Sequence, residues 1–203
     1  MKHILKYLFA FIILFSSVDL FAQDTVKTKE LTKAELRIQR KQQRLEQKQQ
    51  RKLLAQELEK MNHENAVVGI DSQLFVLEAI QAYDRYGNVE NVNSTINFVK
   101  IVDDRAIFQL GFEGLVGYNG VGGITMEGKI SDYQVEKLEN GRVTVKFNAM
   151  GPAMMVSMSF SLDGAGNYAN VKVKAQTENI ELNFRGVIKH MNQSRIYEGM
   201  KVF

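Results

Sequence analysis

The fold is decided by residues 142–162, which read RVTVKFNAMGPAMMVSMSFSL. Apolar side chains recur there at every second position, in two runs. The apolar sets are Val143, Val145, Phe147 and Ala149, followed by Met154, Val156, Met158, Phe160 and Leu162. A period of two is typical of a strand with one face on a core and the other in water. The stretch therefore predicts half-buried antiparallel strands.

The same alternation extends outward from this stretch over most of the chain beyond Gln73. We expect eight antiparallel strands, at residues 73–84, 93–102, 105–112, 123–138, 142–150, 153–162, 167–176 and 179–189. Short turn signals such as Asn140-Gly141 connect several of them. Because closure removes exposed strand edges, we predict an all-β, eight-stranded antiparallel barrel or strongly curled sandwich.

A glycine-rich stretch interrupts this pattern between Gly111 and Gly128, reading GFEGLVGYNGVGGITMEG. Glycine permits tight turns, bulges and close approach of the backbone to another group. An aromatic ring and an amide in such a loop combine contact area with directional hydrogen bonding. We therefore expect a ligand or partner to contact a loop made of Tyr118, Asn119, Gly120, Gly122 and Gly123. The alternative is geometric: the glycines only permit a wide turn that feeds a bent strand.

A charged helical leader, residues 23–62, precedes the predicted strands. Thr32-Lys33-Ala34-Glu35 has the form of a capping box, so a helix should begin at Lys33 and run to about Lys60 through good helix formers. Leu31, Ile38 and Leu45 repeat at seven residues, but Gln42 and Gln49 stand at intervening core positions and Lys52 ends the series. A coiled coil is therefore only weakly indicated.

The leader and the rest of the chain differ in charge. Residues 27–60 contain eleven Lys and Arg against five Asp and Glu, a balance of +6, whereas residues 61–203 contain thirteen against sixteen, a balance of −3. The basic helix is suited to an anionic surface or to the carboxylates of an envelope protein partner. The simpler alternative is a solvated helix that spaces the domain from its neighbours.

The first 22 residues resemble a secretory signal peptide, with Lys2 and Lys6 before an apolar run and Leu20-Phe21-Ala22 before the expected cleavage. The chain has no Cys, so neither a disulfide nor a lipid-bearing cysteine is available. We expect an exported protein, either of the periplasm or cell envelope or secreted. It should contain no transmembrane segment after cleavage and consist of the leader followed by a β domain at residues 63–203.

No residue pattern indicates catalysis, a metal site, a cofactor or a nucleic-acid partner. The Gly123–Lys129 stretch matches a phosphate-binding loop except that Ile130 replaces Ser or Thr, and its alternation is that of a strand. The methionines at 150–158 are better explained as core filling than as copper ligands. His63 and His190 lie in separate segments and suggest no relay. We therefore expect no enzymatic activity.

Several short motifs resemble the domain of unknown function 4251 family of Bacteroidetes envelope proteins. The motifs are Asn97-Phe98-Val99, Arg105-Ala106-Ile107-Phe108-Gln109-Leu110-Gly111, Asn119-Gly120-Val121-Gly122-Gly123-Ile124-Thr125, Glu127-Gly128 and Ser194-Arg195-Ile196-Tyr197-Glu198-Gly199. The resemblance spans roughly residues 75–199 and implies an exported protein with a charged helical leader and a lipocalin-like barrel. Some members resemble lipoproteins, from which this Cys-free chain departs. The resemblance implies no activity.

Two classes of function follow. The first is a binding module that takes a small apolar or amphipathic ligand at the mouth of the barrel, beside the glycine-rich loop. The alternative is a structural or interaction protein of the envelope, with a solid barrel and a partner-docking basic helix. The interior distinguishes them, because it either has room for a ligand or is filled by Phe98, Phe108, Phe147, Met158, Phe160 and Phe184.

Overall fold

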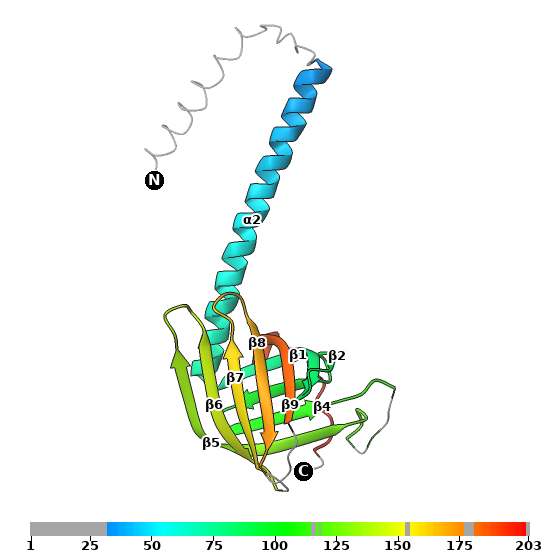
Figure 1. Cartoon of the computed structure of the whole chain (residues 1–203), viewed down its shortest axis with the longest axis vertical. Helices are drawn as coiled ribbons and strands as arrows, with labels where there is room; N and C mark the ends of the chain where they lie inside the picture. Colours follow the sequence, from blue (N-terminus) through cyan, green and yellow to red (C-terminus); the bar gives the residue numbers. More distant parts are fainter. Residues whose placement is uncertain (1–31, 115–116, 118, 153–154, 177–180, 202–203) are drawn as a thin grey trace, which may run out of the picture. The chain divides into compact units, whose positions relative to one another are not determined.

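The computed structural model describes residues 32–114, 117, 119–152, 155–176 and 181–201 (Figure 1). The chain divides into two units between residues 48 and 49. A helix, α2 (Lys33–Asp71), precedes the strands. The strands are β1 (Leu74–Asp84), β2 (Val89–Asn91), β3 (Phe98–Val102), β4 (Arg105–Leu110), β5 (Ile124–Lys137), β6 (Val143–Met150), β7 (Met155–Leu162), β8 (Tyr168–Ala175) and β9 (Glu181–His190). A 3-10 turn, η1 (Met191–Gln193), follows β9.

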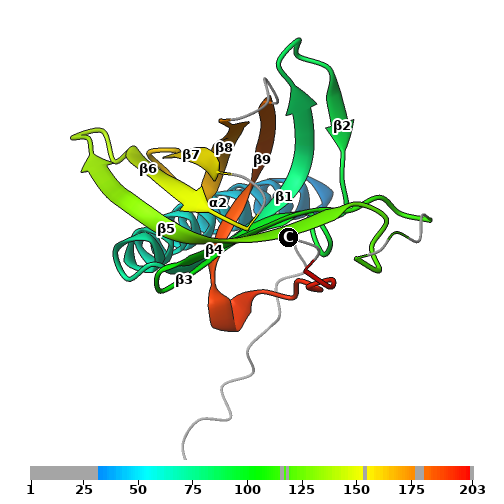
Figure 2. The ribbon, with the colours of Figure 1, turned by 90° about the horizontal axis from the view of Figure 1, so that it is seen from below.

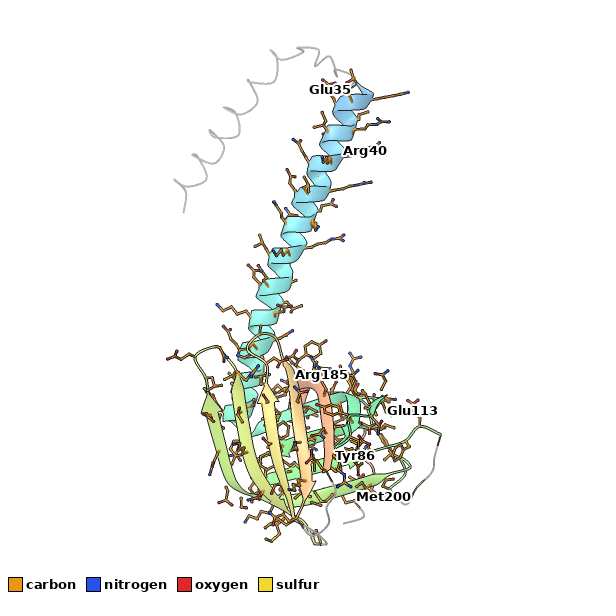
Figure 3. All side chains as sticks on the ribbon, viewed as in Figure 1. Glu35, Arg40, Tyr86, Glu113, Arg185 and Met200 are labelled. Carbon is orange, nitrogen blue, oxygen red and sulfur yellow. The ribbon has the colours of Figure 1, made fainter. Side chains whose placement is uncertain are left out.

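The helix begins where its capping box predicts. The Thr32 backbone nitrogen donates to Glu35 Oε2 (2.8 Å), and the Glu35 backbone nitrogen donates to Thr32 Oγ1 (3.4 Å). Figure 3 shows side chains extending from all sides of the first half of the helix, where Glu35 and Arg40 are labelled. Of the predicted heptad residues, Ile38 and Leu45 are exposed, and Leu31 lies outside the described residues.

The predicted helix end near Lys60 is wrong, because α2 continues to Asp71. Its last turns bury Ala66, Gly69 and Ile70, so tertiary packing extends the helix beyond the polar stretch. The chain then turns at Gln73, whose φ of 53° lies in the left-handed region. The structure does not bear on the division of the chain at residues 62 and 63, which stays a prediction.

The strands form a closed antiparallel barrel. Within the residues that the structure describes, nine strands form one sheet in the order β2-β1-β3-β4-β5-β6-β7-β8-β9, and pairing of β1 with β9 closes eight of them. The eight-stranded antiparallel barrel expected from the alternation is thus confirmed. The likeness to lipocalins stays a prediction. Figure 2 shows from below how the strands curve around a common centre.

The sequence did not predict β2, and it placed the start of β3 too early. β2 pairs with the end of β1 through Gln81 opposite Asn91. All three of its residues are exposed, so β2 has no buried face that would give its sequence an alternation of apolar and polar residues. The predicted strand at 93–102 begins only at Phe98, because the preceding residues form a turn in which the Asn97 backbone nitrogen donates to the Asn93 carbonyl oxygen (3.1 Å).

The centre of the barrel is filled by side chains. Phe75 and Phe160 meet edge to face at 5.6 Å between ring centroids, and Phe108 and Phe184 meet at 5.5 Å. Phe75, Phe160 and Phe184 are 0% exposed, so no water-sized space adjoins these rings. Phe147 and Met158 belong to the same core. The interior therefore resembles the solid alternative rather than an open ligand cavity.

The end of α2 packs onto one end of this core. Ala66 and Ile70 are buried within it. His63 Nδ1 donates to the Gly166 carbonyl oxygen (3.0 Å), and the Tyr133 hydroxyl donates to the Ile70 carbonyl oxygen (2.8 Å). Burial, together with the nearby charge of Asp71, raises the pKa of Tyr133. The last turns of the helix are therefore part of the barrel domain.

Candidate functional site

The glycine-rich loop connects β4 to β5 along a path that needs its glycines. Gly120 has a φ of 77° and Gly122 a φ of 71°, a region that glycine adopts without strain. A Cβ on Gly123 would come within 1.9 Å of the Leu110 carbonyl oxygen. Backbone geometry therefore explains why Gly120, Gly122 and Gly123 are glycines.

Asn119 lies inside the protein rather than at an exposed loop tip, and only 1% of its surface is exposed. Its Oδ1 accepts from the backbone nitrogens of Val121 (3.1 Å) and Gly123 (3.2 Å), and its Nδ2 donates to Thr125 Oγ1 (3.2 Å). Tyr118 lies outside the described residues. The Asn119 amide therefore holds the loop together, and contact of this loop with a ligand stays a prediction.

Gln109 on β4 joins the loop to the C-terminal segment, residues 194–201. Its Nε2 donates to the carbonyl oxygens of Ile96 (3.0 Å) and Tyr197 (2.9 Å). Its Oε1 accepts from the Gly199 backbone nitrogen (2.8 Å) and from Thr125 Oγ1 (3.0 Å). The side chain is 0% exposed, and its outward direction follows from the alternation of β4, in which Phe108 points inward. We call Gln109, Asn119 and Thr125 the polar clamp.

The C-terminal segment follows the outer side of the barrel through main-chain hydrogen bonds. The Tyr197 backbone nitrogen donates to the Thr95 carbonyl oxygen (2.8 Å). The Met200 backbone nitrogen donates to the Asn119 carbonyl oxygen (2.9 Å). Loop and segment are thus bonded to each other directly as well as through Gln109.

A buried glutamate on β1 fixes the start of the same segment. Glu78 is 6% exposed, and its Oε1 accepts from Ser194 Oγ (2.8 Å) and from the Arg195 backbone nitrogen (3.3 Å). Its Oε2 accepts from Lys189 Nζ (2.6 Å). The paired cation and the hydrogen bonds compensate the burial of the carboxylate.

A second, smaller apolar cluster lies beneath the segment. Met191 and Ile196 pack on Val76, Phe98 and Ile107, which are the outward-facing residues of β1, β3 and β4. The prediction that Phe98 fills the barrel interior is therefore wrong. Val99 points inward in its place, because the strand pleat directs successive side chains to opposite faces.

Ion pairs border the clamp. Lys100 Nζ pairs with Glu198 Oε2 (2.9 Å), and Glu127 pairs with both Lys201 and Arg105. Hydrogen bonds from Lys201 and then from Arg105 hold the pKa of the Glu127 carboxyl below its ordinary value. Glu127 therefore stabilises the folded state above the ordinary glutamate pKa, and this contribution is lost as the pH falls below it.

The arrangement is suited to holding chain segments together. Across the described ranges, no buried side-chain nitrogen or oxygen lacks a hydrogen-bond partner. In the same part of the chain, no group of three or more His, Asp or Glu side chains is placed to hold a metal ion. A nucleophile or base needs a group that substrate can reach, whereas the clamp side chains are buried and bonded to one another.

Two surface grooves lined by described residues are open to solvent. One of about 340 Å³ lies over the polar outer face of β5–β8, lined by Lys146, Lys172 and Lys174 among others. Another of about 360 Å³ lies beside the start of the glycine-rich loop, near Asn93 and Glu113. Ligand pockets bury most of a small molecule in an apolar cavity, which neither groove provides.

Comparison with known proteins identifies the family. The family model of a domain of unknown function, DUF4251, matches residues 57–188. The chain belongs to this family. A crystal structure of a DUF4251 family protein from Bacteroides eggerthii DSM 20697 is similar, with a TM-score of 0.60 and 28% identity over 68% of this chain and 94% of that one. No curated protein matches the chain.

The DUF4251 match includes the end of α2 as well as the barrel. It begins at residue 57, so the helical turns that bury Ala66 and Ile70 lie inside it. It ends at residue 188, before the C-terminal segment. The sequence motifs drew attention to the stretches containing Gln109, Asn119 and Gly199, but gave no sign that these residues meet. A polar residue on the outward face of a strand is the only local signal for Gln109, and many exposed residues share it.

Proposed function

We propose that this DUF4251 protein is an exported, non-catalytic interaction protein of the cell envelope, whose solid barrel supports a basic helix that docks on an anionic surface. The observation that carries the proposal is the filled interior. Rings from β1, β4, β7 and β9 meet at its centre, where a binding module of the lipocalin kind would hold its ligand. The filled interior favours an interaction protein over a module that binds a small ligand inside its barrel.

The basic helix supplies the docking surface. Residues 33–52 carry eight Lys and Arg against two Glu, and all of them are exposed. A cation near an anionic lipid surface contributes about 1 kcal/mol, so such a cluster supports binding through charge alone. The helix contains no stretch long and apolar enough to cross a membrane, in the part of the chain that the structure describes.

Sedimentation with vesicles tests this proposal. The protein from Gln23 onward should bind vesicles rich in phosphatidylglycerol and not neutral phosphatidylcholine vesicles. Binding should be lost near 1 M salt, where the Debye length is about 3 Å. Replacing Arg37, Arg40 and Arg44 by Gln should weaken binding by about tenfold or more.

A matched control removes the same number of cations from the barrel. Lys146, Lys174 and Arg185 are exposed residues of β6, β8 and β9, and their replacement by Gln should leave binding nearly unchanged. Equal losses in the two triple variants would mean that the helix is not the docking surface. Absence of binding to anionic vesicles at low salt would refute the proposal itself.

A further inference from the structure

The second half of α2 carries a line of exposed side chains, which we call the seam. It is separate from the repeat of Leu31, Ile38 and Leu45 in the first half of the leader. The seam consists of four apolar residues and one asparagine, namely Leu54, Leu58, Met61, Asn65 and Val68. The spacings are four, three, four and three residues, which place these side chains along one line of a helix. The four apolar ones are 64%, 52%, 51% and 60% exposed, and Asn65 is exposed as well.

The seam faces away from the barrel. Ala66 and Ile70, which are 1% and 0% exposed, pack on the barrel core, and His63 bonds to the turn before β8. With 3.6 residues per turn, His63 and Ile70 lie opposite the seam of Leu58 and Met61. The barrel therefore holds one side of these turns and leaves the seam in solvent.

The charges beside the seam disfavour an anionic surface as its occupant. Residues 54–71 contain Lys60 against four acidic residues, the reverse of the basic first half of α2. Two of the acidic side chains near the seam already have cations of their own chain. Glu64 pairs with Lys60 (3.9 Å), and Asp71 pairs with Lys137 (2.6 Å). A second seam can thus approach without uncompensated charge at these positions.

We propose that a second copy of this chain docks on the seam, forming a short, parallel, two-stranded coiled coil through residues 54–68. An identical seam supplies matching knobs and holes. The heptad places Leu54, Met61 and Val68 at the d positions and Leu58 and Asn65 at the a positions. A single asparagine at an a position specifies the register and the number of strands of a coiled coil, at a cost in stability.

Asn65 also decides the orientation of the two helices. In the parallel arrangement the two Asn65 side chains lie opposite each other, and each amide offers a donor and an acceptor to the other. In an antiparallel arrangement an a position faces a d position, so Asn65 lies against an apolar residue of the other copy. A buried amide without a partner is costly, and the parallel arrangement avoids this cost.

The flanking charges favour the same orientation. In the parallel arrangement Glu57 lies opposite Asn62 of the other copy and Glu64 lies opposite Gly69, so no like charges meet. An antiparallel arrangement that pairs Leu58 with a Met61 residue brings Glu57 of one copy beside Glu64 of the other, which is repulsive.

The seam is short, so the dimer is weak and depends on concentration. Arg51 occupies the next seam position toward the N-terminus, which ends the apolar contact there. Two heptads bury far less surface than a standard interface. We expect a dissociation constant between about 1 µM and 1 mM. This inference concerns the second half of α2, and it does not depend on docking by the basic first half.

Sedimentation equilibrium of the protein from Gln23 onward, at concentrations up to about 1 mM, tests the dimer. Leu58→Glu should weaken self-association by about tenfold or more, because a carboxylate cannot enter the apolar seam. Leu53→Glu is the matched control, since Leu53 is 60% exposed on the same helix but lies off the seam. Thermal unfolding of both variants checks that the fold is intact. A monomer at every concentration, or equal effects of the two substitutions, would overturn the proposal.

Disulfide cross-linking tests the orientation. The chain has no Cys, so a single introduced thiol reports one position. In the parallel arrangement Leu54→Cys brings two identical positions within the roughly 7 Å that a disulfide requires, whereas Leu53→Cys does not. Covalent dimer should therefore form from Leu54→Cys and much less from Leu53→Cys. No covalent dimer from Leu54→Cys would overturn the parallel arrangement.

Discussion

At the scale of single residues, Gln109 is the connection between parts of the chain that are far apart in sequence. A glutamine amide offers donors and acceptors at once, so one side chain bonds to Ile96, Thr125, Tyr197 and Gly199. Gly199 must be glycine for this approach, since a Cβ there would lie 2.4 Å from the Asn119 carbonyl oxygen. In the clamp, both the nitrogen and the oxygen of the Gln109 amide are hydrogen-bonded, and the backbones of Gly199 and Asn119 lie close together.

Replacing Gln109 by Ala should therefore be strongly destabilising. Buried partners lose their hydrogen bonds, and each such group costs about 1–3 kcal/mol, so we expect a loss of about 3 kcal/mol or more. For a protein of this size that lowers the melting temperature by roughly 6–12 °C. Gln134→Ala, at an exposed glutamine of β5, is the control and should change it little. A similar small change for both would show that the clamp does not stabilise the fold.

At the scale of elements, α2 has two parts with different physical roles. Its first part is exposed on every side and is helical because of its capping box and its residue composition. Its last turns are helical in a stretch that includes Gly69, a poor helix former, where the barrel core buries one face. The same element therefore begins as a solvated helix and ends as part of a packed domain.

Thermal unfolding should separate these two parts. Deleting residues 28–60 should lower the melting temperature by less than about 8 °C, because little apolar surface is removed from the core. Ile70→Ala should lower it by about 8 °C or more, because it leaves a cavity at a 0% exposed site. Both are measured by circular dichroism at low protein concentration. A larger loss from the deletion than from Ile70→Ala would contradict this division.

At the scale of the whole molecule, closure of the barrel depends on the meeting of β1 and β9. Gly186 on β9 lies beside an irregularity in β1 between Ala79 and Gln81, where the pairing shifts. A Cβ on Gly186 would come within 2.0 Å of the Glu78 carbonyl oxygen. The close approach of these two backbones joins the first and the last strand of the domain and closes the barrel.

Export is a property of the whole chain that the fold leaves open, and the signal-like first 22 residues predict it. When the full chain is expressed in a Bacteroidetes host, it should appear in the envelope or medium with its N-terminus at Gln23. Mass spectrometry of the purified protein measures this directly. A chain without residues 1–22 should stay in the cytoplasm. Recovery of the uncleaved full chain from the cytoplasm would contradict export.

The sequence alone determined the class of fold and most of its elements. Alternation such as that of Val143, Val145 and Phe147 specifies which face of a strand is buried, and this signal is local. The start of α2 was equally predictable, since the capping box of Thr32 and Glu35 lies within one turn of helix. Family membership could also be read from short motifs, because these are contiguous in the chain.

Only the tertiary structure decided which parts of the chain those motifs contact and which of their side chains are buried. Alternation places Gln109 on the outer face of β4 but does not say that the C-terminal segment covers it, and the composition of the glycine-rich loop does not say that Asn119 is buried. The end of α2 at Asp71 likewise depends on the barrel core that buries Ile70. Long-range hydrogen bonding and burial depend on which segments meet in space, and local sequence patterns do not predict these contacts. The physical reason is that the sequence specifies the chemistry of each side chain, whereas the packing of the rest of the fold determines its solvent exposure.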